Sequence, residues 1–254
     1  MRVTILGCGS SDGVPQIGCK CTVCKSTNPK NNRTRASILL EVDNFKILID
    51  AGPDIRSQAL REGITTIDAV LFTHAHFDHI GGIGDLRAMM YNRGSKAIPM
   101  FADSETNKAI KSTFGYAFNT KSALYPGILE SHVFYGEFSL LGPNIAVKPF
   151  KQKHGKYFSY GFRIGDFAYS TDVNAFDEEA YMSLEGVKVW IIDCLKYYTS
   201  PTHFSLDDTS REIYRINPTE AIITHMCHDI DYELLSRTLP SNIRLSYDGM
   251  KINL

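Results

Sequence analysis

The stretch Leu71–Gly82, LFTHAHFDHIGG, decides the fold of this 254-residue chain. An apolar run leads into it, and the glycine pair Gly81–Gly82 closes it and lets the following helix begin close by. Between them stand closely spaced metal-binding side chains, His74, His76, Asp78 and His79. Divalent metal ions prefer such ligands, and residues two apart on an extended segment project to the same side. The stretch therefore predicts a metal site at the end of a strand.

Further ligand-type residues follow predicted strands downstream. His154 comes after the run IAVKPFKQK, Asp172 after FAYST, and His225 ends AIITH. Taken alone, each has an ordinary explanation as a surface histidine or a helix-capping aspartate. A site with two metal ions needs more ligands than the first motif can supply. We therefore interpret these residues and the first motif together as one site.

A second cluster, GCKCTVC at positions 18–24, places Cys19, Cys21 and Cys24 close together. In a reducing compartment such a cluster is more often a thiolate metal site than part of a disulfide framework. A structural zinc ion needs four ligands. The spacing alone leaves the fourth open among Cys8, Cys194, Cys227 and a histidine, and His228 lies three residues after His225.

The composition bounds the function classes. The chain is 43% hydrophobic and 22% charged, and its formal net charge is −1. That balance argues against broad charge-driven binding to nucleic acid or anionic membranes, although a small anionic substrate stays open. No run is long and apolar enough for a membrane span, and the N-terminus lacks a signal-peptide core, so we expect a cytoplasmic protein with no membrane partner. The absence of a linker predicts one domain over residues 1–254.

The apolar patterning predicts a layered α/β architecture. About a dozen short β-branched runs alternate with stretches of helical spacing. The stretches with helical spacing lie at 54–62, 82–91, 104–114, 177–184, 205–216 and 231–239. The segment 94–143 is the least regular, and little beyond one helix and loop is predicted there.

The histidine motif resembles that of the metallo-β-lactamase fold superfamily, whose hydrolases carry H-x-H-x-D-H after a strand. The resemblance implies a four-layer αββα sandwich, with two mixed β-sheets flanked by helices and a two-metal site at one sheet edge. It implies that one ion is held by His74, His76 and His154, and the other by Asp78, His79 and His225. Asp172 would bridge the two ions, with a hydroxide between them as the nucleophile.

Within the superfamily, the chain resembles the PhnP-like cyclic phosphodiesterases over nearly its full length. The likeness rests on the cysteine cluster and on LGCGSSDGVP, ILIDAGPD, YSTD, IIDC, HFSL and THMCHD, in the family's order. It implies that His228 completes a structural zinc site with Cys19, Cys21 and Cys24. It also implies that His203 lies near the substrate without binding metal.

The expected function is hydrolysis of small or cyclic phosphodiesters, including nucleotides, by two divalent ions, zinc or manganese, with one further structural zinc. His203 and Asp78 are the predicted catalytic residues, His203 as general acid or hydrogen-bond donor. Lys156, just after His154, is a candidate phosphate contact, and His203 is the other predicted substrate-binding residue, although loop lysines are commonly only solvated.

Alternative functions remain open at this point. The same metal motif serves hydrolases of lactones, thioesters and β-lactams, and transfer-RNA processing nucleases of the tRNase Z type. No Lys/Arg block marks a nucleic-acid arm, so no stable nucleic-acid complex is expected. A binding module without catalysis would be favoured by loss of a bridging ligand, and none is lost. The resemblance is compatible with a homodimer.

Overall fold

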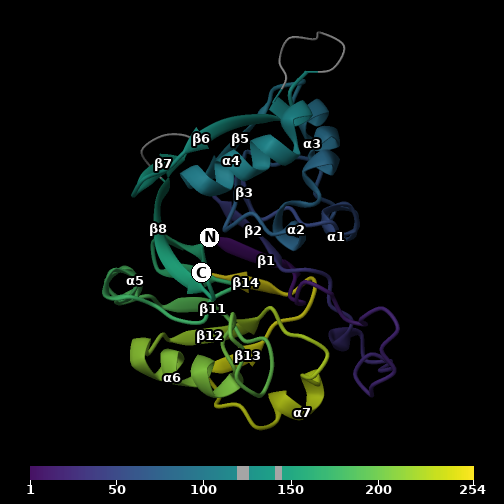
Figure 1. Ribbon diagram of the computed structural model, residues 1–254, viewed down its shortest axis with the longest axis vertical. Coiled ribbons are helices and arrows are strands. Elements are labelled where there is room, and N and C mark those ends of the chain that lie inside the picture. Colours follow the sequence, from purple (N-terminus) through teal and green to yellow (C-terminus); the bar gives the residue numbers. More distant parts are fainter. Residues whose placement is uncertain (119–125, 141–144) are drawn as a thin grey trace. The chain divides into compact units, whose positions relative to one another are not determined.

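The computed structural model describes residues 1–118, 126–140 and 145–254. The described chain divides into two compact units, and each is built on one seven-stranded sheet (Figure 1). The first unit comprises residues 1–6, 37–135 and 249–253, and the second comprises residues 7–36, 136–248 and Leu254. The prediction of a single domain over residues 1–254 stays a prediction.

The sheet of the first unit has the order β14-β1-β2-β3-β4-β5-β6. β1 pairs with β14, and β2 with β3, in the antiparallel direction, whereas β3, β4, β5 and β6 follow one another in parallel. The sheet is therefore mixed, as predicted. Its strands are β1 (Arg2–Gly7), β2 (Ser37–Val42), β3 (Phe45–Ile49), β4 (Ala69–Leu71), β5 (Ile98–Ala102), β6 (Leu129–Val133) and β14 (Lys251–Asn253).

Helices α1 (Ile55–Glu62), α3 (Leu86–Asn92) and α4 (Ser104–Thr113) bury apolar faces in the core of the first unit. That core joins side chains of the parallel strands, such as Leu48 and Val70, to the helices. The one-turn helix α2 (Phe77–Ile80) comes after β4 and contains the second half of the histidine motif. The shorter helical turns of the unit are η2 (Ile83–Asp85) and η3 (Gly115–Phe118).

The sheet of the second unit has the order β13-β12-β11-β10-β9-β8-β7. β10 to β13 run parallel, whereas β7, β8, β9 and β10 pair antiparallel. The parallel strands read as continuous apolar runs because both faces are buried. The strands are β7 (Phe138–Leu140), β8 (Ile145–His154), β9 (Tyr157–Ile164), β10 (Phe167–Ser170), β11 (Val189–Asp193), β12 (Glu220–Thr224) and β13 (Ile243–Leu245).

Helices α5 (Glu178–Leu184) and α6 (Leu206–Ile216) pack on this sheet through a core that includes Trp190. Ser205 caps the N-terminus of α6. Its hydroxyl accepts a hydrogen bond from the backbone amide of Asp208, and the Asp208 carboxylate accepts one from the backbone amide of Ser205. This capping box fixes the loop just before the helix. The unit also contains α7 (Tyr232–Ser236) and the short turn η1 (Pro29–Asn31).

The predicted fold class is confirmed: two mixed sheets are flanked by helices. Each predicted helical stretch contains a helix, although 82–91 divides into η2 and α3. The segment 94–143 holds more order than predicted, since β6 and β7 lie there, and only residues 119–125 and 141–143 of it fall outside the described residues. Both strands are short edge elements with weak apolar alternation, which explains the omission. Among the described residues, no helix is long and apolar enough to cross a membrane.

Candidate metal centres

The histidine motif of the first unit lies where β4 ends and α2 begins. His74 and His79 are buried with ring centroids 4.3 Å apart, and the more exposed His76 places its Nδ1 2.8 Å from the Nε2 of His74. Asp78 is buried, with a carboxylate oxygen 3.2 Å from the Nε2 of His79. The structure therefore brings together the four ligand candidates of this motif.

Asp50, at the end of β3, holds this motif from behind. Its carboxylate accepts the Thr73 amide (2.9 Å) and the Thr73 hydroxyl (2.8 Å), and it lies 2.7 Å from the Nδ1 of His79. Burial raises the pKa of Asp50, and the nearby His79 works in the opposite direction. An ionised carboxylate only accepts hydrogen bonds, so the contact places a proton on the Nδ1 of His79 and leaves its Nε2 for a metal.

Gly82 has a packing role in addition to the predicted one. A Cβ on Gly82 would lie 2.1 Å from the carbonyl oxygen of Gly52 and 2.5 Å from the side chain of Ile55. Gly82 is thus required because its backbone approaches the start of α1 closely.

Three histidines of the second unit converge on the carboxylate of Asp172. The carboxylate of Asp172 lies 3.3 Å from the Nε2 of His225, 3.7 Å from that of His154 and 3.8 Å from that of His203. The rings of His203 and His225 are stacked, with centroids 4.8 Å apart. All four residues are buried, although they come from four separate segments of the chain. Three predicted ligands and the predicted catalytic histidine therefore meet within the second unit.

Asp193, at the end of β11, orients two of these imidazoles. One carboxylate oxygen lies 3.2 Å from the Nδ1 of His203, and the other lies 3.2 Å from the Nδ1 of His225. Burial opposes ionisation of Asp193, but the two histidines outweigh it and lower its pKa. The Nδ1 of His154 likewise donates to the carbonyl of Thr202 at 2.8 Å. Each of the three imidazoles thus has a carboxylate or carbonyl oxygen close to its Nδ1 and presents Nε2.

Three of the residues at strand ends have left-handed backbones, with φ of 64° at Asp50, 52° at Asp172 and 61° at His225. Such values are uncommon for residues other than glycine, and they concentrate at functional sites where the surrounding structure holds them. The backbone geometry thus marks the same strand ends that the ligand pattern marks.

The donor sets fit divalent metal ions. Imidazole nitrogens with their second nitrogen bound to a carboxylate or carbonyl are the usual form of histidine ligands, and carboxylates complete such sites. The two donor sets belong to different units: the first unit holds His74, His76, Asp78 and His79, and the second unit holds His154, Asp172 and His225. That the two sets share ions stays a prediction.

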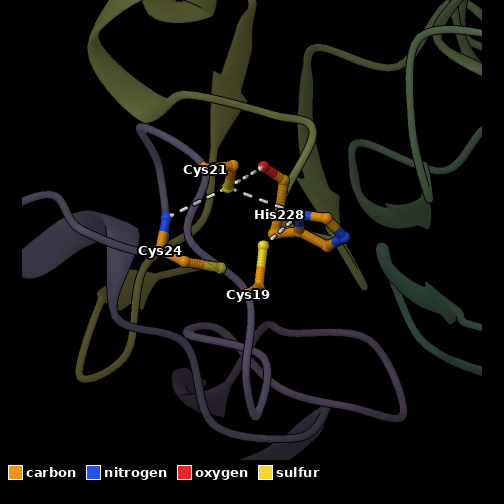
Figure 2. A group of neighbouring side chains, drawn as sticks. All are labelled: Cys19, Cys21, Cys24 and His228. Atoms are coloured by element: carbon orange, nitrogen blue, oxygen red, sulfur yellow. Dashed lines mark hydrogen bonds between the residues drawn. The ribbon is translucent and has the colours of Figure 1, made fainter.

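The cysteine cluster lies wholly in the second unit, and Figure 2 shows its side chains facing one another. The Nδ1 of His228 lies 3.5 Å from the sulfur of Cys19 and 3.4 Å from that of Cys21, and the ligand atoms of all four residues lie within 4.8 Å of one another. Tetrahedral zinc with Zn–S near 2.3 Å and Zn–N near 2.0 Å separates sulfur from nitrogen by about 3.5 Å. The four side chains therefore fit a zinc ion, and His228 takes the position that the spacing left open.

Hydrogen bonds already favour thiolate in this cluster. The Cys24 amide donates to the sulfur of Cys21, and with His228 it lowers the pKa of the Cys21 thiol to about 6. Burial raises the pKa of Cys24 to about 11. Metal binding would have to displace that proton, so the affinity of the cluster for metal falls as pH falls.

The remaining predicted contact, Lys156, lies exposed on the turn between β8 and β9, beside His154. Sequence reasoning missed the roles of Asp50 and Asp193. Each is an aspartate directly at the end of a buried apolar run, and such a residue needs a buried polar partner.

Residues 46–226 match the family described as the Beta-lactamase superfamily domain. A solved structure described as a new diphosphatase from the PhnP family is 35% identical, with a TM-score of 0.92, and the match covers 100% of this chain and 97% of that one. Zinc-bound PqqB from Methylobacterium extorquens (18% identity, TM-score 0.78) covers the full length of both chains and is alike in fold.

Among curated proteins, an octanoyltransferase of Porphyromonas gingivalis is 34% identical over 99% of this chain and 51% of its own length. The Coenzyme PQQ synthesis protein B of Methylobacterium radiotolerans is 38% identical over 34% of this chain and 34% of its own length. The chain thus spans about half of the first relative and about a third of the second.

The family match and the likeness to the PhnP-family structure imply a hydrolase that depends on divalent metal ions, and the ligand geometry agrees with it. By sequence and fold, the chain belongs to the metallo-β-lactamase superfamily and, within it, to the PhnP family.

Proposed function

We propose that this hydrolase cleaves small or cyclic phosphodiesters, nucleotides among them, with two divalent metal ions. One observation carries the proposal: His203 lies among the ligand candidates, held through Nδ1 by Asp193, with its Nε2 directed to Asp172. An imidazole in that place can protonate or hydrogen-bond a leaving oxygen.

In this proposal the ligand sets of the two units share the ions. His74, His76 and His154 would hold one ion, Asp78, His79 and His225 the other, and Asp172 would bridge them. Bound divalent ions would supply a water of lowered pKa and would neutralise the charge that builds up on the phosphoryl oxygens. Zinc and manganese both suit mixed histidine and carboxylate ligation.

The other residues would orient and exchange protons. Asp193 keeps a proton on the Nδ1 of His203, so that its Nε2 can carry the proton that the leaving oxygen needs. Burial of His203 keeps bulk water from competing for that contact. Lys156, on the exposed turn, would offer a positive charge to a substrate phosphate.

A second candidate is hydrolysis of a diphosphate bond, because the relative at 35% identity is described as a diphosphatase. A diphosphate that joins two organic groups has disubstituted phosphoryl centres like those of a phosphodiester. The same residues would serve both reactions, and only the leaving group differs.

A structural zinc ion completes the proposal. We assign it to Cys19, Cys21, Cys24 and His228 because four ligand atoms converge there and none belongs to the proposed catalytic set. Closed sites of this type hold loops in place and do not take part in the chemistry.

The test is a substrate panel with the purified protein loaded with zinc or manganese. It compares bis(p-nitrophenyl) phosphate, a 2′,3′-cyclic nucleotide, a ribose cyclic phosphate and a dinucleoside diphosphate with a lactone, a thioester and a β-lactam. Hydrolysis of the phosphodiesters supports the first proposal, and hydrolysis of the diphosphate alone supports the second. Turnover of the acyl substrates alone would contradict both, and cleavage of precursor transfer RNA alone would favour the tRNase Z alternative.

His203→Gln separates the proposed acid from the metal ligands. We expect turnover to fall about 100-fold or more, the usual contribution of a positioned acid, with metal content unchanged. The matched control is His132→Gln, because His132 is a half-exposed histidine stacked on Phe101 in the first unit. Full activity of His203→Gln, or loss of its metal, would remove His203 from the proposed role.

A further inference from the structure

Arg33 is a fully buried arginine next to the cysteine cluster in the second unit. It is 1% exposed, and its guanidinium makes four hydrogen bonds within that unit. The acceptors are neutral oxygens: the carbonyls of Lys30, Cys227 and Ile230 and the side-chain oxygen of Asn31. A buried guanidinium is costly, so this arrangement needs a reason.

Two of these bonds enclose the zinc-ligand candidate His228. Arg33 donates to the Cys227 carbonyl at 2.9 Å, just before His228, and to the Ile230 carbonyl at 2.6 Å, two residues after it. One rigid, planar group thus spans the loop that carries the imidazole.

Asn31 extends the same clamp. Its side-chain oxygen accepts hydrogen bonds from the Arg33 guanidinium and from the backbone amide of Tyr232, at 2.9 Å each. Its side-chain nitrogen donates a hydrogen bond to the carboxylate of Asp231 at 2.9 Å. The loop from Cys227 to Tyr232 is therefore held at several points from one side.

The charges agree with a metal centre nearby. Burial lowers the pKa of Arg33, while Asp231 and Asp248 favour its charged form. A zinc ion with three thiolates and a neutral imidazole carries one net negative charge, which a buried guanidinium would offset.

We propose that Arg33 is a positioning residue for the structural zinc site. Arg33 holds the Cys227–Ile230 loop so that the imidazole of His228 faces the three sulfurs. The inference rests on the proposed assignment of zinc to the cysteine cluster. It also gives the loop a wider importance, because His225, a proposed active-site ligand, lies three residues before His228.

The experiment titrates full-length protein with cobalt(II), whose thiolate-to-metal absorption reports the cysteine cluster alone, and competes the cobalt with zinc. Arg33→Lys keeps the charge but loses the planar set of donors. We expect zinc affinity at the cluster to fall about 10- to 100-fold, the usual cost of removing a group that orients a ligand. Arg35→Lys is the matched control, because Arg35 donates to the Ser11 carbonyl instead, and it should bind as the wild type does.

A double-mutant cycle with His228→Ala tests the route of the effect. If Arg33 acts through His228, Arg33→Lys weakens metal binding in the wild-type background and adds nothing in His228→Ala. A general loss of structure would lower affinity equally in both backgrounds and would overturn the proposal, as would wild-type affinity in Arg33→Lys. If Arg33→Lys does not fold, Asn31→Ser takes its place in the cycle with the same expected and contrary outcomes.

The failure of the two proposals can be told apart. Wild-type protein without thiolate-to-cobalt absorption would refute the zinc assignment itself. Wild-type protein with that absorption, beside an Arg33→Lys variant of equal affinity, would refute only the role of Arg33.

Discussion

The two halves of the proposed catalytic set are built in contrasting ways. In the first unit, the ligand candidates lie in one stretch of six residues that runs from the loop after β4 into α2, and Asp50 fixes His79. In the second unit, His154, Asp172 and His225 come from separate strand ends, and Asp193 fixes two imidazoles at once. One half is thus local in sequence, and the other depends on tertiary packing.

This difference predicts where each half is vulnerable. A contiguous motif keeps its spacing even if its surroundings relax, because the chain itself sets the distances. Dispersed ligands keep their spacing only while the sheet and the buried carboxylate hold them. The second unit should therefore lose function more readily when a residue that supports the ligands is removed.

The largest effect should follow Asp172→Asn, which removes the charge on which three imidazoles converge. Metal ions supply several kcal/mol of transition-state stabilisation, and about 1.4 kcal/mol is a factor of ten, so we expect turnover to fall about 1,000-fold. Metal content measured by elemental analysis should fall as well. The control is Asp166→Asn, an exposed partner of Lys188. If Asp172→Asn kept both its activity and its metal ions, the proposed role of Asp172 as the ligand that bridges the two ions would be refuted.

Asp193→Asn against Asp50→Asn tests the contrast most directly. Loss of a group that orients a ligand typically costs about 10- to 100-fold in metal affinity or activity. We expect Asp193→Asn to reach the upper end, because Asp193 contacts two imidazoles, and Asp50→Asn the lower end, because backbone spacing still holds its motif. Metal affinity and turnover are measured for both variants. A larger loss in Asp50→Asn would reverse the contrast.

The cysteine cluster should influence stability more than catalysis. At free zinc 1,000 times the dissociation constant, binding stabilises the folded state by about 4 kcal/mol, and each kcal/mol raises Tm by about 2–4 °C in chains near this size. Cys21→Ser should therefore lower Tm by roughly 10 °C and remove one zinc ion per chain. Cys227→Ser, which removes another candidate for the fourth ligand, should keep that zinc ion. Equal loss in both variants would reopen the identity of the fourth ligand.

The smallest effect should come from Asp231, which caps α7 and accepts Asn31. Although burial opposes its charge, the hydrogen bonds to Asp231 lower its pKa below the ordinary 3.8. A lowered carboxyl pKa stabilises the fold above the ordinary value, and the gain is lost as pH falls through the folded pKa. Asp231→Asn should thus cost about 0.5 kcal/mol near pH 7 in urea unfolding, and wild type and variant should converge in acid. A gap that persists in acid would assign the cost to lost packing.

Much of this architecture could be predicted from the sequence because it rests on local patterns. Apolar runs predicted most strands of both sheets, and the motif after β4 predicted a metal site because its ligands share one segment. The edge strands β6 and β7 escaped, since their pattern is weak and their pairing is decided by neighbours.

The supporting carboxylates could not be assigned from the sequence. Asp50 and Asp193 look alike, each ending an apolar run, and nothing local says which imidazoles they contact. The same holds for Arg33, whose clamp joins it to a loop nearly two hundred residues away. Long-range partners of buried charges emerge only in the folded chain.

Trp190, the only tryptophan, is buried in the core of the second unit, and its indole nitrogen donates to the Ser170 hydroxyl at 3.0 Å. Its fluorescence is therefore a built-in optical probe of that unit alone, whereas circular dichroism averages over the whole chain. Coincident denaturation curves from the two signals would mean that both units unfold as one cooperative domain, and separated curves would mean that each sheet melts on its own.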